Sequence, residues 1–177
     1  MKDINNFINE SKKLKRDSEY VKNIKNWIDN VNKTGNKLDD SQLNDLTVQL
    51  RKYFIQLDYS ELGLGFQDKD LICDIAGYII EAAAYDAIKQ SNKVTSRSGR
   101  GLKIDGQSIY WDFAIEGIDE KFEIKSICKN GYHTGSISPS KNQKNDKELI
   151  YIIIPYKAYE TGFDVITDDI KITRKYN

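Results

Sequence analysis

The chain has 177 residues, of which 39% are hydrophobic and 31% are charged, so it can bury a core of its own. Its formal net charge of zero gives no sign of nucleic-acid binding through overall charge. No apolar run is long enough to span a membrane, and residues 1–13 lack a signal-peptide core, so we expect a cytoplasmic protein without a membrane partner. One histidine and two separate cysteines, Cys73 and Cys128, exclude a Cys/His zinc cluster, and we expect both cysteines to be reduced core residues.

Charge is unevenly distributed along the chain. Acidic residues dominate 58–74, whereas lysine and arginine dominate 86–103 and 125–147. Basic patches of this kind can bind phosphate groups. Charge alone nevertheless favours an ordinary mixed surface.

The chain up to about residue 90 is predicted to be helical, because its apolar residues recur at intervals of three and four. A first helix covers residues 20–31 and ends before Gly35. A second helix begins at Asp39, which forms a capping-box pattern with Gln42. A third helix runs from about Asp70 to Gln90 and has an apolar face broad enough to indicate burial.

Two carboxylates, Asp74 and Glu81, lie on the opposite face of this third predicted helix. Acidic residues on a largely buried helix need a reason. Glu81 could belong to a functional site, or it could simply lie on a face of the helix that is exposed to solvent.

Beyond residue 92 the pattern changes to that of β-strands separated by glycine-containing turns. Strands are predicted over residues 108–116, 121–128 and 149–156, with a last strand or pair over 163–173. Residues 129–147 are expected to form a long loop, or a short helix near 140–147. Helices followed by a hairpin and by a strand covered on both faces predict an α/β domain with a mixed sheet.

The hairpin carries the residues of chemical interest. Side chains alternate along a strand, so Glu123 and Lys125 point the same way, while Phe122 and Ile124 point to the other face. Asp112, on the preceding strand, can come opposite them. Two carboxylates and a lysine would then meet in the sheet, unless Glu123 and Lys125 only form the solvated face of an amphipathic strand.

The pattern Asp112…Glu123-Ile-Lys125 resembles the D…(D/E)-x-K signature of the PD-(D/E)XK, or restriction-endonuclease-like, nuclease superfamily. The resemblance covers roughly residues 70–156, because a helix with a glutamate precedes the hairpin and an apolar strand follows it. Trp111 stands where the family motif has proline. The implied fold is a restriction-endonuclease-like mixed sheet flanked by helices.

The resemblance implies a metal-dependent endodeoxyribonuclease, most like a small type II restriction endonuclease that cleaves double-stranded DNA as a homodimer. Asp112, Glu123 and the carbonyl of Ile124 would hold Mg²⁺, with Mn²⁺ as a substitute. Lys125 would assist the attacking water, and Glu81 would support the metal or its waters. The helical region 1–66 would serve dimerisation or embrace DNA beside a catalytic core over 67–177, unless the chain is one compact domain.

Two polar segments are candidate DNA contacts. Ser96, Arg97 and Arg100 precede the hairpin and could touch phosphates, and Lys141 belongs to a second basic segment. Gln143 resembles a polar residue that some members of the superfamily carry after the motif. For both segments a solvated loop is the alternative.

Two other functions remain open from the sequence. A structure-specific nuclease such as a Holliday-junction resolvase shares the glutamate-bearing helix and the hairpin motif. A non-catalytic DNA-binding module could use the same fold without the chemistry. The single histidine, His133, argues against HNH, zinc-hydrolase and Ser-His-Asp mechanisms.

Overall fold

The computed structural model describes Lys22 and residues 34–62, 69–92, 94–97, 103–104, 107–108, 110–132 and 138–176. Apart from Lys22, the helix predicted over 20–31 lies outside these residues. The described elements are α3 (Asp40–Ile55), α4 (Lys69–Lys89), β1 (Val94–Arg97), β2 (Lys103–Ile104), β3 (Gln107–Ser108), β4 (Phe113–Ile115), β5 (Lys121–Cys128), α5 (Lys141–Asn145), β6 (Leu149–Ala158), β7 (Phe163–Val165), the 3₁₀ turn η2 (Thr167–Asp169) and β8 (Lys171–Thr173).

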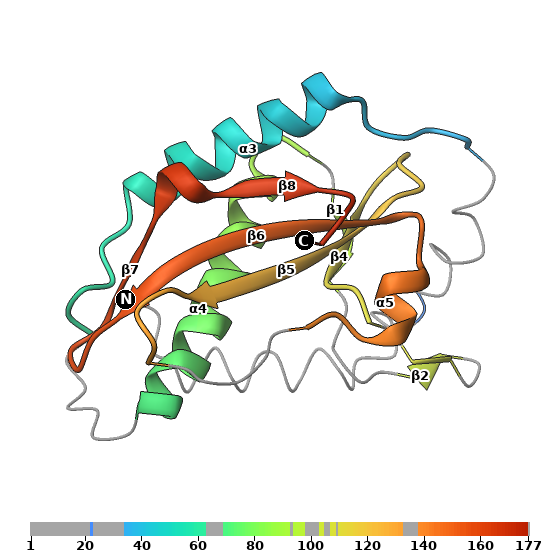
Figure 1. Cartoon of the computed structure of the whole chain (residues 1–177). Helices are drawn as coiled ribbons and strands as arrows, with labels where there is room; N and C mark the ends of the chain where they lie inside the picture. The colour runs from blue at the N-terminus through green and yellow to red at the C-terminus, as the bar shows by residue number, and fades with distance from the viewer. Residues whose placement is uncertain are drawn as a thin grey trace.

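A mixed sheet forms the centre of the fold, in the order β1-β4-β5-β6-β7 (Figure 1). Strand β5 pairs in parallel with β6, from Lys121 opposite Leu149 to Cys128 opposite Tyr156, and the other described pairs of this sheet are antiparallel. Strands β7 and β8 both pair with β6 and share its other edge. The predicted α/β fold with a mixed sheet is confirmed.

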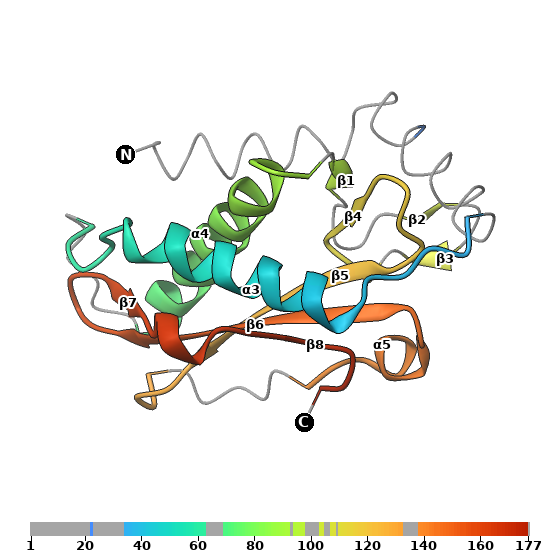
Figure 2. The same cartoon turned by 90° about the horizontal axis from the view of Figure 1, so that it is seen from above.

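Helices α3 and α4 form one layer against the sheet, whereas α4 and α5 lie on opposite sides of it (Figure 2). Helix α3 begins where the capping box predicts: Asp39 Oδ1 accepts a hydrogen bond from Gln42 N at 2.8 Å, and Gln42 Oε1 accepts one from Asp39 N at 2.9 Å. Its apolar stripe then packs inward. The buried residues of α3 are Leu43, Leu46, Leu50 and Phe54.

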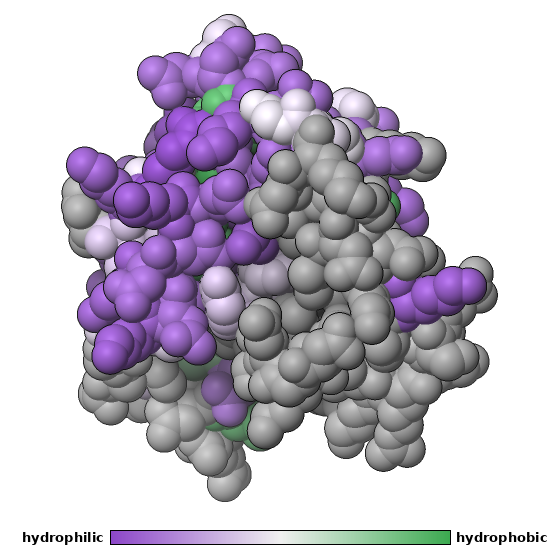
Figure 3. Space-filling model, turned by 90° about the vertical axis from the view of Figure 1, so that its right-hand side faces the viewer, coloured by the Kyte–Doolittle hydropathy of each residue, from purple (hydrophilic) through white to green (hydrophobic). Residues whose placement is uncertain are grey.

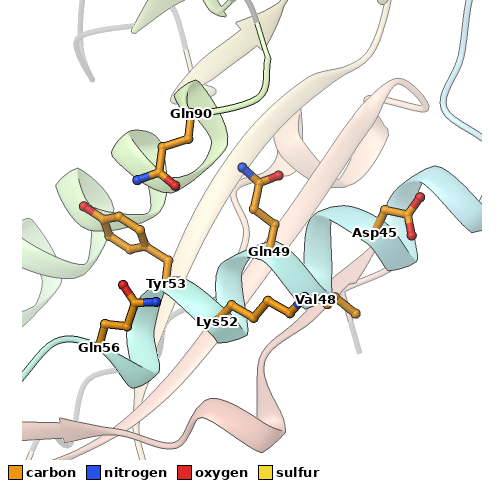
Figure 4. A pocket seen from close by; sticks show the side chains of 7 residues that line it. All are labelled: Asp45, Val48, Gln49, Lys52, Tyr53, Gln56 and Gln90. Carbon is orange, nitrogen blue, oxygen red and sulfur yellow. The ribbon is translucent and has the colours of Figure 1, made fainter.

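Helix α4 closely matches its predicted span and packs along β5. A Cβ added at Gly77 would lie 3.4 Å from Ser126 Oγ, an ordinary packing distance, so α4 lies close to β5 here. The end of α4 is held by α3, because Gln49 Nε2 donates to Ala87 O at 2.5 Å. Beside this contact lies a largely polar pocket, shown in Figure 4 and lined by Asp45, Val48, Gln49, Lys52, Tyr53, Gln56 and Gln90.

Two apolar clusters cover the two faces of the sheet. The larger contains the inner faces of α3 and α4 with Phe122, Ile124 and Ile152, so α3 shares one core with the sheet. The smaller lies on the other face and is formed by Trp111, Ala114, Leu149, Tyr151 and Ile153. No helix in the described parts of the chain is both long and apolar enough to cross a membrane.

The turn between β4 and β5 ties distant segments together. Asp119 accepts hydrogen bonds from Thr34 Oγ1 and, at 2.9 Å, from Gly35 N. Glu120, which is 1% exposed, accepts one from Leu38 N at 2.8 Å and one from Arg174 Nε at 2.7 Å. Two buried carboxylates in one turn thus hold both the entry to α3 and the C-terminal segment.

Some predicted strand boundaries were wrong. The strand predicted over 108–116 is reduced to β4, because residues 110–112 leave the ladder, and 107–108 pair instead with 103–104 in a separate small hairpin. Strand β1 was not predicted. Strand β5 spans the predicted residues, β6 extends two residues further, and the last segment is a pair of strands, β7 and β8. Both cysteines are thiols; Cys73 is buried and Cys128 half-buried.

Substituting Ile152→Ala is expected to lower the free energy of unfolding by about 2–5 kcal/mol, because the side chain is fully buried in the central strand. The exposed Ile55, at 68% exposure, provides the matched control, and Ile55→Ala should change stability by no more than about 0.5 kcal/mol. Urea unfolding followed by circular dichroism measures both. Equal effects would mean that β6 is not the centre of the core.

Candidate active site

Strand β5 places Glu123 and Lys125 on one face of the sheet, as predicted. Phe122 and Ile124 belong to the core under α3 and α4, whereas Ile127 packs in the smaller cluster on the other face. Alternation along the strand therefore directs Glu123 and Lys125 to the face away from α4. Parallel pairing places Tyr151 beside Glu123 and Ile153 beside Lys125.

Glu123 and Lys125 form a buried ion pair. Glu123 is fully buried, Lys125 is 6% exposed, and Lys125 Nζ lies 2.6 Å from Glu123 Oε1. Burying both charges costs desolvation energy that their mutual attraction only partly offsets, so stability alone does not explain the pair. The alternative of a solvated strand face does not fit this burial.

Asp112 reaches β5 from just before the start of β4. Its side chain is 2% exposed, and Oδ2 accepts a hydrogen bond from Ile124 N at 2.6 Å. Its own N–H donates to Phe122 O at 2.7 Å. The Asp112 side chain thus accepts the Ile124 N–H, which would otherwise bond to a backbone carbonyl of a longer β4. This explains why the β4–β5 pairing extends no further than Phe113. The carboxylate is fixed beside the residue that separates Glu123 from Lys125.

The burial of this site also affects the neighbouring strand. Burial raises the pKa of Tyr151, and the negative charge of Glu123 raises it further. Tyr151 therefore stays protonated near neutral pH and donates from its hydroxyl to Gln143 O at 3.1 Å. The Glu123 face is in this way connected to α5.

The donor set fits a hard divalent cation. Asp112 and Glu123 supply carboxylate oxygens from neighbouring strands, and together with Lys125 the three side chains carry one more negative charge than positive. Among the residues that the structure describes, no group of three or more His, Cys, Asp or Glu side chains could hold a metal ion. Two carboxylates are nevertheless enough for Mg²⁺, which keeps several waters when it binds to protein.

Glu81 lies on α4, between two contacts of that helix with the sheet. One turn before it, Gly77 approaches Ser126, and one turn after it the Tyr85 ring contacts Phe113 with centroids 6.1 Å apart. Glu81 is half-buried and Asp74, seven residues earlier, is exposed. Because α4 covers the face opposite to the Glu123 side chain, the role of Glu81 in supporting a metal remains a prediction.

Helix α5 lies near the same face as the ion pair. Gln143 is buried, closes a capping box with Ser140, and donates from Nε2 to Tyr110 O at 2.8 Å. These bonds give Gln143 a structural role, and a DNA contact through its amide stays a prediction that would require them to break. Lys141, at the start of α5, is exposed.

A second polar cluster connects α5 with both strands of the hairpin. Asp146 Oδ2 accepts hydrogen bonds from Lys121 Nζ at 2.6 Å and from Tyr110 OH at 2.7 Å. Burial alone would raise the pKa of Asp146, but the bonds from Lys121 and Tyr110 outweigh it and the pKa is lowered. Nothing in the sequence singles out this aspartate, which stands among lysines and asparagines and meets its partners only in the folded chain.

The basic segment before the hairpin is described only in part. Ser96 and Arg97 lie in β1, where their backbones pair with Ala114 and Phe113 of β4. Arg100 lies outside the described residues. The pairing places this segment beside the strand that leads from Asp112, and DNA contacts by Ser96, Arg97 and Arg100 stay predictions.

No family model, curated protein or solved structure matches the chain. The functional argument therefore rests on the arrangement of Asp112, Glu123 and Lys125.

Substituting Lys125→Met should lower the free energy of unfolding by about 3 kcal/mol, because the Glu123 charge stays buried without its partner. The double variant Glu123→Gln/Lys125→Met should be less destabilised than Lys125→Met, since it leaves no such charge. The exposed Lys157→Met is the matched control, and urea unfolding gives all values. A Lys125→Met variant as stable as Lys157→Met would contradict a buried pair.

The lowered pKa of Asp146 predicts an acid-sensitive contribution to stability. The unfolded value is about 3.9, so the contribution is complete above this pH and is lost as the pH falls toward the lower folded value. The stability difference between the native chain and Asp146→Asn should therefore shrink below about pH 4. Unfolding curves between neutral and acidic pH test this, with the exposed Asp168→Asn as control. A constant difference would show that Asp146 is not held by its two donors.

Proposed function

We propose that the chain is a Mg²⁺-dependent endonuclease that hydrolyses phosphodiester bonds of DNA. The observation that carries the proposal is that the buried Asp112 carboxylate bonds to β5 at Ile124 N, between the two residues of the buried Glu123–Lys125 ion pair. Buried charged groups that stability does not explain are characteristic of active sites. The same three residues carry the resemblance to the PD-(D/E)XK superfamily.

Asp112 and Glu123 are the residues that would hold the metal, with the Ile124 carbonyl as a third ligand and Mn²⁺ as a substitute ion. When bound, the ion would lower the pKa of a coordinated water and offset negative charge on the phosphate. The hydrogen bond from Ile124 N fixes one oxygen of Asp112, and Lys125 fixes one oxygen of Glu123.

Lys125 would act on the water and the phosphate. Its Nζ is held at Glu123 Oε1 at 2.6 Å and brings a positive charge into a site with little solvent, where electrostatic stabilisation is strong. From there Nζ can orient the attacking water and stabilise the charge that develops on the phosphate oxygens. Water then replaces the sugar oxygen at phosphorus, and the leaving oxygen takes up a proton.

DNA is the proposed substrate because exposed basic residues lie near this face. Lys141 and Lys144 of α5 are exposed. Helix α5 is attached to Tyr151, the residue beside Glu123 on the next strand, by the hydrogen bond from the Tyr151 hydroxyl to Gln143 O. Lysines of this kind can contact phosphates without reading sequence. The described surface on the α5 side of the molecule is mostly hydrophilic, as expected for a surface that binds a charged polymer (Figure 3).

A sequence-specific type II restriction endonuclease, acting as a homodimer, is the form of this activity that the resemblance favours. Cleavage of both strands at a symmetric site requires two active sites related by a twofold axis. If the chain were instead a structure-specific nuclease, the same three residues would act on branched DNA. A non-catalytic module would bind DNA without needing Lys125.

Incubating long linear DNA of mixed sequence with Mg²⁺ should give discrete fragments, and EDTA should abolish them. Asp112→Asn, Glu123→Gln and Lys125→Met should each lower the rate by about 100-fold or more, because each removes a group that acts on the metal, the water or the phosphate. Lys157→Met and Asp164→Asn, at exposed positions of β6 and β7, are the matched controls and should cleave normally. Gel electrophoresis of timed samples measures the rates.

The substrate and the variants separate the alternatives. Cleavage of four-way junctions but not of linear DNA would indicate a structure-specific nuclease. Binding of DNA without cleavage, unchanged in Lys125→Met, would indicate a non-catalytic module. Cleavage that persists in all three active-site variants would place the chemistry elsewhere.

A further inference from the structure

Asp146 holds one residue near each of the two candidate metal ligands, Asp112 and Glu123. Its Oδ2 accepts hydrogen bonds from Tyr110 OH at 2.7 Å and from Lys121 Nζ at 2.6 Å. Tyr110 stands two residues before Asp112, and Lys121 stands two residues before Glu123. One oxygen of Asp146 therefore binds one residue near Asp112 and one residue near Glu123.

The two strands differ in how much other support they have. Lys121 begins β5, and Leu149 of the parallel strand β6 stands beside it. Residues 110–112 precede β4 and lie outside the ladder, so their position depends on individual contacts. These include Asp112 N to Phe122 O at 2.7 Å and Gln143 Nε2 to Tyr110 O at 2.8 Å. The Tyr110–Asp146 bond completes the attachment of the Asp112 segment.

Asp146 is itself fixed to the body of the fold. Its Oδ1 accepts a hydrogen bond from Glu148 N at 2.9 Å, next to the start of β6, and its N–H donates to Gln143 O at 3.3 Å at the end of α5. Oδ1 thus anchors the side chain to the entry of the central strand, while Oδ2 reaches the hairpin. Because the Asp146 carboxylate is anchored beside β6, it fixes Tyr110 and Lys121 relative to that strand.

The contact lies partly out of water, since the Lys121 and Asp146 side chains are 15% and 9% exposed. Charge-assisted hydrogen bonds are shorter and stronger than neutral ones. The Lys121 ammonium also lies 5.9 Å from the centre of the Tyr110 ring, so Lys121 and Tyr110 also contact each other. The three groups form one unit.

We propose that Asp146 is a positioning residue that sets the separation of Asp112 and Glu123 and thereby the affinity of the site for its divalent cation. The inference rests on the proposed function, because it assumes that these two carboxylates bind the metal. Asp146 acts through Tyr110 and Lys121 and does not itself touch the ion. Groups that orient metal ligands commonly change affinity by about 10–100-fold when they are altered.

The test is metal affinity of the full chain, measured by calorimetric titration with Mn²⁺ and by the Mg²⁺ dependence of DNA cleavage. Asp146→Asn should weaken Mn²⁺ binding by about 10-fold and raise the half-saturating Mg²⁺ concentration similarly, with the rate largely restored at saturating Mg²⁺. Asp168→Asn, a matched change at an exposed position, should alter neither value. A merely structural role would lower the unfolding midpoint and leave the metal dependence unchanged.

Double variants show whether the effect passes through the two hydrogen bonds. Tyr110→Phe and Lys121→Met should each weaken Mn²⁺ binding in the native background. Each should have little additional effect in the Asp146→Asn background, because the shared acceptor is already altered. Full additivity would overturn the proposal.

The inference and the proposed function fail in different ways. If Asp112→Asn and Glu123→Gln abolish Mn²⁺ binding while Asp146→Asn leaves it unchanged, the positioning role is wrong and the proposed site stands. If the native chain binds no Mn²⁺, or if Asp112→Asn and Glu123→Gln do not weaken binding, both are wrong.

Discussion

The parallel pairing of β5 with β6 is the constraint on which the rest of the structure depends. It places an eight-residue strand in the middle of the sheet, with one face under α3 and α4 and the other beside α5. The two faces of β5 carry different kinds of side chain. Phe122 and Ile124 pack into the larger apolar cluster, whereas Glu123 and Lys125 place charge on the opposite face, beside the smaller cluster. The sheet therefore carries a buried charged site that its apolar residues must stabilise.

That site also changes the local course of the backbone. A continuing β4 would pair with β5 through its main chain, but the Asp112 carboxylate accepts the Ile124 N–H instead. The same residue that supplies a candidate ligand thus sets where β4 begins. Because residues 110–112 leave the ladder, they need other attachments, and the contacts from Gln143 and Asp146 supply them. One hydrogen bond of the Asp112 side chain therefore both fixes a candidate ligand and limits the length of β4.

Much of the fold could be predicted because the apolar pattern reports burial directly. The capping box at Asp39, the span of α4 and the limits of β5 depend on local sequence and were predicted closely. The convergence of Glu123 and Lys125 followed from alternation along one strand. The short length of β4 could not be predicted, because it depends on a hydrogen bond from Ile124 N to the Asp112 side chain that forms only in the folded hairpin. The partners of Asp146 are likewise set by tertiary packing, and no local pattern marks them.

The turn at Asp119 and Glu120 has a consequence for how the chain can be divided. Its carboxylates hold Gly35 and Leu38 before α3 and Arg174 near the C-terminus, so the hairpin that carries Asp112 and Glu123 is attached to both ends of the described fold. A fragment that starts at residue 67 would leave Glu120 without Leu38 and would uncover the face that α3 packs against. A minimal fragment that keeps this fold therefore has to begin before α3 and keep Arg174.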